Sequence, residues 1–188
     1  MIASRAEIRE SLAAVVRLWR GDVSAFETFD RSLDGFWRSY TAALIGAPVH
    51  ALLLLATLGQ AAAPIDSVHD LAVEAIAYAT TWLAWPLLIV AIAERLDRAE
   101  RYFDYMVPYN WATLAQLLVL TAAALLRTIL PGFLGGVLML VAFAAVIHLQ
   151  WFLARFGLQI GTGLAILVVI ADFSLSFLVS GLADYLRD

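Results

Sequence analysis

The chain has 188 residues, of which 63% are hydrophobic and 15% are charged, and its formal net charge is −4 at pH 7. A soluble domain is about half apolar and about a quarter charged, so this composition predicts a membrane protein and not a nucleic-acid-binding one. Cysteine is absent, which excludes disulfides, thiolate nucleophiles and cysteine-ligated metal sites.

Residues 1–34 are predicted to form an amphipathic N-terminal arm at the cytoplasmic membrane surface. Ser4 and Glu7 have the spacing of a capping box, and Ser24 and Glu27 predict a second one. Apolar residues recur between them at helical spacing, namely Ile8, Leu12, Val15, Val16 and Trp19. Such a helix either lies on anionic lipid or packs against the membrane-spanning helices, and both alternatives stay open.

The segment Gly35–Tyr40 opens the first apolar run and is predicted to begin the membrane domain, residues 35–188. An arginine and aromatic rings beside the end of an apolar run are typical of a membrane interface. On this pattern the predicted interface residues are Trp19, Trp37, Arg38, Tyr109 and Trp111.

Five apolar segments follow, each close to the roughly 20 residues that a helix needs to cross a bilayer. The fold class is therefore predicted to be all-α, a polytopic bundle of five transmembrane helices behind an amphipathic arm. The predicted spans are about 39–59, 71–93, 110–130, 133–153 and 159–181.

The first connector contains Asp66, His69 and Asp70, which are potential metal ligands. The interpretation we favour is a helix start, because Ser67 is a good N-cap and Asp70 suits the positive end of the helix. No metal or cofactor site is predicted.

The second connector carries most of the charge between the spans. Glu94–Arg98 and Asp97–Arg101 have the spacing of stabilising ion pairs on a helix, so the second helix is predicted to project beyond the bilayer. Pro108 is predicted to separate this projection from the third span.

All 12 basic residues are arginines, and ten of them fall in the arm, the second connector or the fourth connector. Loops enriched in arginine remain in the cytoplasm. The sequence therefore predicts a bacterial inner (plasma) membrane protein with its N-terminus in the cytoplasm and its C-terminus outside.

Several short motifs resemble those of a group of small uncharacterised bacterial inner-membrane proteins with five spans. They are Trp19-Arg20-Gly21-Asp22, Phe29-Asp30, Gly35-Phe-Trp-Arg-Ser39, Pro48 inside the first span and Tyr109-Asn-Trp111. An arm followed by five spans also resembles the layout of the Yip1 family, whose eukaryotic members work in membrane trafficking. Neither resemblance implies a known activity or known site residues.

Few polar side chains lie inside the predicted spans, and Asp172 is the only acidic residue deep within one. A charged group at that depth is costly unless it is paired, hydrated or neutral, so Asp172 is predicted to face other helices. It then either belongs to a functional site with His50 or Arg127, or joins helices as a structural group near Ser176. The intramembrane candidates are Asp172, His50, Arg127, His148 and Ser176.

No acid, base and nucleophile cluster near either interface, so no catalytic residue and no enzymatic activity are predicted. The leading expectation is a scaffold, assembly factor or subunit of a membrane complex, in contact with the bilayer and with a membrane-protein partner or a second copy. The alternatives are a small transporter or channel with a polar site around Asp172, and an intramembrane or lipid-modifying enzyme.

Overall fold

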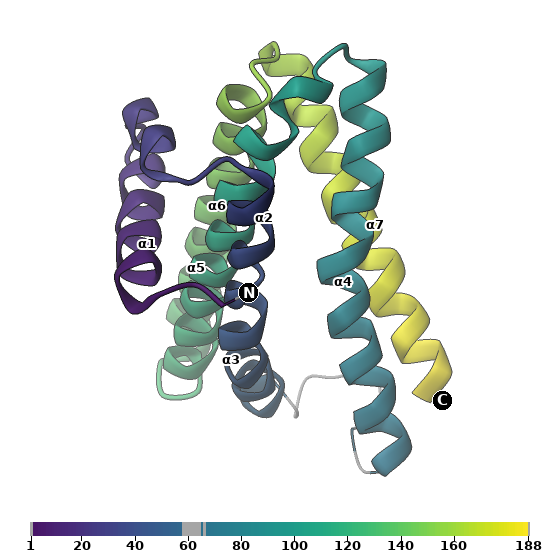
Figure 1. Ribbon diagram of the computed structural model, residues 1–188. Helices are drawn as coiled ribbons and strands as arrows, with labels where there is room; N and C mark the ends of the chain where they lie inside the picture. The colour runs from purple at the N-terminus through teal and green to yellow at the C-terminus, as the bar shows by residue number, and fades with distance from the viewer. Residues whose placement is uncertain (1, 58–64, 66, 188) are drawn as a thin grey trace.

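The computed structural model describes residues 2–57, 65 and 67–187, and within them it contains helices and no strands. The predicted all-α class is therefore confirmed (Figure 1). The helices are α1 Arg5–Trp19, η1 Val23–Thr28, α2 Leu33–Ser39, α3 Thr41–Thr57, α4 Val68–Arg95, η3 Ala99–Arg101, α5 Tyr102–Arg127, α6 Gly132–Gly157 and α7 Thr162–Arg187.

Five segments of the described chain are long and apolar enough to cross a membrane, which matches the predicted number of spans. They are Leu33–Thr57, Val68–Arg95, Ala99–Arg127, Gly132–Gly157 and Thr162–Arg187. The helices extend beyond the predicted limits at most ends, because polar caps and half-turns continue them past the apolar run. The last predicted residue of the first span, residue 59, lies outside the described residues.

The long helices form two groups. Helix α5 packs against α3 and α6 in the first group, whereas α4 packs mainly against α7 in the second, and α7 also packs against α6. Figure 1 shows α4 and α7 side by side, apart from α3. We call the end that holds the α4–α5 and α6–α7 connectors the arginine-rich end. The other end, where α3 and α7 finish, is the opposite end.

Helix α5 is the centre of the bundle. Half of its most apolar stretch is buried, compared with 17–22% for the other four segments. Tyr105, Trp111 and Leu114 are at most 1% exposed. Gly157 allows α6 to approach closely, since a Cβ there would lie 3.0 Å from the Tyr105 Cα. Because α5 is the most buried of the long helices, both helix groups are organised around it.

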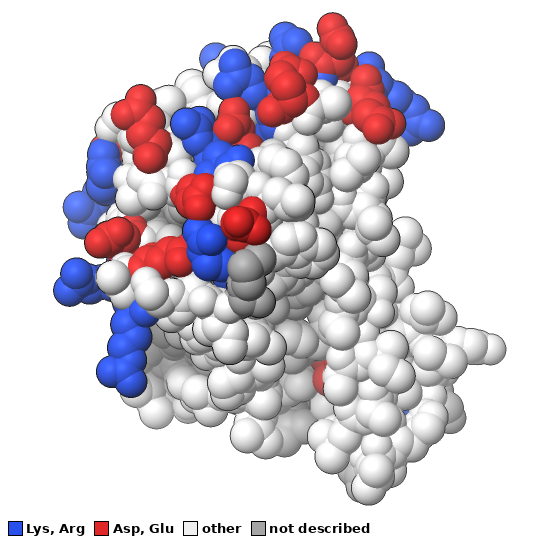
Figure 2. Space-filling view, viewed as in Figure 1, with Lys and Arg blue, Asp and Glu red and all other residues white. Residues whose placement is uncertain are grey.

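The arm packs on protein through the apolar face of α1. Val15 and Leu18 are fully buried, and the Trp19 indole donates a hydrogen bond to the Ala145 carbonyl of α6 at 2.9 Å. Charged side chains of the arm and of the arginine-rich end gather over one side of the molecule (Figure 2). This arrangement supports the alternative in which the helix packs against the spans.

Capping in the arm differs from the two predictions. Only half of the first predicted capping box forms: the Ser4 hydroxyl accepts from the Glu7 amide, but the Glu7 carboxylate pairs with Arg38. The second capping box, at Ser24, is wrong. Asp22 caps η1 instead, because its carboxylate accepts from both the amide and the hydroxyl of Ser24. A shorter 3₁₀ helix therefore replaces the predicted α-helical turn.

Two predictions for the second connector are wrong. Helix α4 ends at Arg95 and Asp97 has a positive φ of 56°, so the predicted i,i+4 pairs have no helix to hold them. Arg101 pairs with Asp104 at 2.9 Å instead. Pro108 lies inside α5 and does not separate two helices, because α5 already begins at Tyr102 and packing on α3 and α6 supports it through the proline.

Candidate functional site

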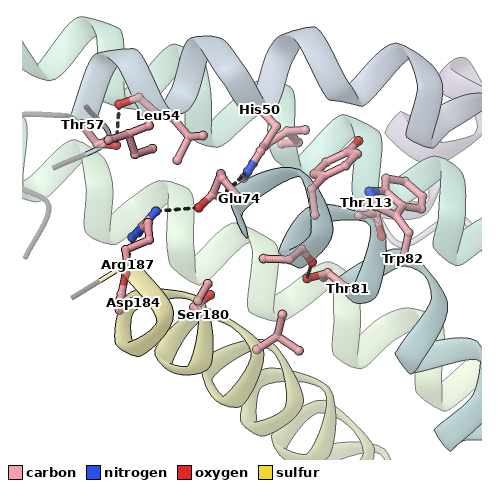
Figure 3. Close-up of a pocket in the computed structure, with 16 residues that line it drawn as sticks. His50, Leu54, Thr57, Glu74, Thr81, Trp82, Thr113, Ser180, Asp184 and Arg187 are labelled. Carbon is pink, nitrogen blue, oxygen red and sulfur yellow. Dashed lines mark hydrogen bonds and ion pairs between the residues drawn. The ribbon is translucent and has the colours of Figure 1, made fainter. Parts of the chain in front are cut away.

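A cavity of about 340 Å³ lies between the two helix groups, in the half of the bundle toward the opposite end. Its walls come from α3, α4, α5 and α7, and most of its surface is apolar. Figure 3 shows His50, Glu74 and Arg187 approaching one another from three of these helices. A concave apolar site with a few convergent polar groups is the usual form of a small-molecule site.

A series of charged contacts lies in the wall of this cavity. The Arg187 guanidinium donates to Glu74 Oε2 at 2.8 Å and also to the Asp184 carboxylate. The other Glu74 oxygen lies 2.9 Å from His50 Nε2. Since a carboxylate only accepts, His50 Nε2 carries the hydrogen in this contact. The series links α3, α4 and α7, and we call His50, Glu74, Asp184 and Arg187 the ionic network.

Burial strengthens the interactions between the charged groups of the ionic network. The side chains of Arg187 and Glu74 are 6% and 16% exposed, whereas that of Asp184 is 48% exposed. Charges held away from water interact more strongly than surface pairs do, and breaking one leaves an uncompensated charge. The network therefore fixes the relative position of α4 and α7 at the opposite end.

Aromatic side chains form the inner wall of the cavity. The Tyr78 hydroxyl donates to the Ala43 carbonyl at 2.7 Å, which joins α4 to α3. The ring of Tyr78 lies 4.9 Å from that of His50 and 6.2 Å from that of Trp82. Gly46 makes this wall possible, because a Cβ there would lie 2.7 Å from the Tyr78 hydroxyl.

Beyond the inner wall the bundle is closed by a second polar cluster. Asp172 is 6% exposed, and the Tyr109 hydroxyl lies 2.9 and 3.0 Å from its two carboxylate oxygens. The Trp85 indole donates to the Tyr105 hydroxyl at 3.1 Å nearby. Thr113, one turn beyond Tyr109 on α5, already lines the cavity. The buried pair of Tyr109 and Asp172 thus seals the side toward the arginine-rich end.

The predicted site residues are brought together only in part. Asp172 faces other helices, as predicted, but its partner is Tyr109, and His50 belongs to the ionic network instead. Arg127 is exposed at the C-terminal end of α5 and contacts Gly135. His148 stacks near Trp151 and lines an apolar groove between α6 and α7. Ser176 is half-buried and outside the cavity.

The predicted interface residues differ in how exposed they are. Trp37 is 52% exposed, while Arg38 forms ion pairs with Glu7 at 3.0 Å and with Asp30 at 2.5 Å. Tyr109 and Trp111 are 8% and 1% exposed, so their predicted place against lipid headgroups is wrong. The reason is that neighbouring helices cover α5 on every side over residues 105–112. Trp19 lies half-buried on α6 and does not face outward.

Sequence reasoning missed Asp184 and Arg187 altogether and noted Glu74 only as a residue near a helix start. One signal could have found them. Glu74 lies near the start of the second span and Arg187 near the end of the fifth, and five helices that cross a membrane in alternation bring these two ends to the same side. In the first connector Ser67 caps α4, as predicted, and Asp70 completes a capping box with it. No metal-binding cluster occurs among the described residues, which exclude Asp66.

Comparison with known proteins adds no relative to this description. No family model, no curated protein and no solved structure matches the chain. The two resemblances drawn from short motifs and layout stay predictions.

Proposed function

We propose that the protein is a small membrane transporter that binds an amphiphilic molecule in the cavity between α3, α5, α4 and α7. The observation that carries the proposal is the ionic network inside a cavity that is otherwise largely apolar. Buried charges in a membrane protein are expensive and mark paths for ions or substrates. A lipid-filled gap between helices would not need them.

The division of the helices supports a moving part. Two hydrogen bonds join α4 to α3, those of His50 with Glu74 and of Tyr78 with the Ala43 carbonyl, and a third joins α4 to Tyr40, just before α3, through the Trp82 carbonyl at 3.5 Å. Rocking of one helix group against another around a fixed site is how many transporters alternate access. We propose that α4 and α7 form the group that moves.

The same proposal assigns sides. Ten of the 12 arginines lie in residues 1–38, in or beside the α4–α5 connector, or at Arg155, and this bias favours the cytoplasm for that side. The cavity would then open on the outer side of the inner membrane, with the pair of Tyr109 and Asp172 closing it from the cytoplasm. The scaffold or subunit role, a protein partner and a second copy stay predictions that compete with this one.

The test is release of preloaded dye from liposomes that contain the purified protein. Three dansyl probes of similar size are used: dansylcadaverine, its N-acetyl derivative and dansyl-aminohexanoate. We expect at least one to leave about fivefold faster than from protein-free liposomes, with the excess abolished in Ser180→Phe, which fills the cavity wall on α7. Ser174→Phe, on the same helix but outside the cavity, is the matched control. Equal rates with and without protein for all three probes would reject transport.

A further inference from the structure

Four of the five hydroxyl groups that line the cavity have already used their hydrogens, and the fifth belongs to Ser180. Each of the four donates to a backbone carbonyl: Thr57 to Leu53, Tyr78 to Ala43, Thr81 to Ala77 and Thr113 to Tyr109. A hydroxyl has one hydrogen and two acceptor lone pairs. What these four groups retain for a ligand is therefore acceptor capacity.

The charged donor of the lining, Arg187, is already paired with two carboxylates. Each of its terminal nitrogens donates to one of them, and the side chain is only 6% exposed. With Nε2 donating to Glu74, a neutral His50 has only an acceptor left at Nδ1. An anionic ligand would have to compete with Glu74 and Asp184 for this buried guanidinium.

The carboxylates, in contrast, keep room for a further donor. Each Glu74 oxygen has one recorded partner, and a carboxylate oxygen accepts two hydrogen bonds. With one arginine and two acids, the ionic network has a formal charge of −1 when His50 is neutral. The charge balance and the hydrogen-bond balance therefore select the same ligand, a cation that donates.

The apolar part of the lining selects the rest of the molecule. Tyr78, one turn from Glu74 on α4, presents an aromatic ring to the cavity, and Trp82 follows it one turn further on. Such rings attract a cation held within about 6 Å of the ring centre. Leu54, Leu117 and Val179 supply aliphatic walls around them. A cationic head beside Glu74 would leave its apolar body against these side chains.

We infer that the cavity takes a protonated amine carried on an apolar body, with its ammonium bound by Glu74 and flanked by the aromatic wall. This inference rests on the proposed function and names the substrate class of the same site. It also gives Arg187 a role, which is to hold Glu74 and Asp184 ionised and in place without filling the site.

Energy transfer from tryptophan to the three dansyl probes measures the ligand class in the full-length protein in nanodiscs, with empty nanodiscs subtracted. We expect saturable transfer with dansylcadaverine, at an apparent Kd about tenfold below those of the acetylated and carboxylate probes. Glu74→Gln should raise the amine Kd about tenfold or more, since a buried charge partner is lost. Glu10→Gln, on the exposed face of α1, should leave it unchanged.

Arg187→Gln separates a ligand role from a structural one. It makes the network more negative, so amine binding should persist or tighten, whereas an anion site would lose its probe. If either variant fails to fold, the ranking of the three probes on the unmodified chain decides. Equal or tighter binding of the acetylated or carboxylate probe overturns the amine class and leaves the transporter standing. No saturable transfer with any probe overturns both.

Discussion

The Tyr109 hydroxyl lies between the two carboxylate oxygens of Asp172, 2.9 and 3.0 Å away, and joins α5 to α7 in the buried centre of the bundle. Together with the hydrogen bonds of Trp85 with the Tyr105 hydroxyl and of Tyr102 with the Pro86 carbonyl, it holds the second helix group to the central helix near the arginine-rich end. Neither of the two sequence-based alternatives, a partnership with His50 or Arg127 and a structural group near Ser176, named Tyr109 as the partner. The strength of the contact between Tyr109 and Asp172 determines how firmly the bundle is closed at that end.

Removing the hydroxyl should therefore cost stability. Tyr109→Phe leaves the Asp172 carboxylate buried without its donor, which is expected to lower the free energy of unfolding by about 1–3 kcal/mol. Asp172→Asn keeps an acceptor for Tyr109 and should cost less, near the roughly 0.6 kcal/mol of an average interhelical hydrogen bond. Thermal or denaturant unfolding in detergent measures both.

Tyr185→Phe is the control, because Tyr185 is 75% exposed at the opposite end of α7. An unchanged stability in Tyr109→Phe would contradict the closing role of the pair. Asp172→Asn also separates the two readings of that residue. If Asp172→Asn loses dye release at normal stability, Asp172 belongs to a functional site. If the variant is only less stable, Asp172 joins helices as a structural group.

Gly46 should be the least replaceable residue of the cavity wall. In Gly46→Ala the new Cβ would lie 2.7 Å from the Tyr78 hydroxyl, so α3 and α4 must separate or the bond to Ala43 must break. We expect a loss of about 1–3 kcal/mol, the usual cost of overpacking. Gly136→Ala on α6 meets nothing within 4 Å and should be neutral. Equal stability of the two variants would show that the wall tolerates displacement.

The helices could be predicted from the sequence, but the contacts between them could not. Five apolar runs of spanning length give five helices, and the Ser67 cap follows from local spacing alone. The contact of Glu74 with Arg187 joins positions 113 apart, and its geometry depends on how α4 and α7 are rotated. Helices that are apolar all round carry little periodic signal, so packing decides their rotation. For the same reason Trp111 was expected at a surface and is buried.

Docking of the arm should depend on Leu18. This side chain is fully buried between α1 and its neighbours, so Leu18→Ala is expected to weaken docking by about 2–4 kcal/mol. Hydrogen exchange of α1 amides in nanodiscs should then become faster, while α5 stays protected. Val16→Ala, at a 45% exposed position on the same helix, is the control. Unchanged exchange in Leu18→Ala would indicate that lipid, and not protein, holds the arm.

The threading of the chain is tested by labelling single cysteines in this cysteine-free protein. A cysteine at Ser24 should react with a membrane-impermeant maleimide only after the cells are opened, because the arginine bias places η1 in the cytoplasm. A cysteine at Tyr185, at the exposed opposite end of α7, should react in intact cells. Reaction of both on the same side would overturn the five-span threading.

Acid should loosen the arm. Hydrogen bonds from Ser32 and from the Arg38 guanidinium lower the pKa of Asp30 below its ordinary value of 3.8. A carboxyl whose pKa is lower in the folded state stabilises that state fully above its unfolded pKa, and the stabilisation disappears as the pH falls through the folded value. The contact between Asp30 and Arg38 should therefore persist at neutral pH and fail only below about pH 3.8.

A spin label on a cysteine at Ala13, an exposed position of α1, reports this change in nanodiscs. Its motion should increase between pH 6 and pH 3, while a label at Ser174 on α7 should not respond. Asp30→Asn removes the titrating group, so α1 should be equally mobile at both pH values and more mobile than the unmodified arm at pH 6. An unmodified arm as rigid at pH 3 as at pH 6 would mean that the apolar contacts of Val15 and Leu18 hold it without the ion pair.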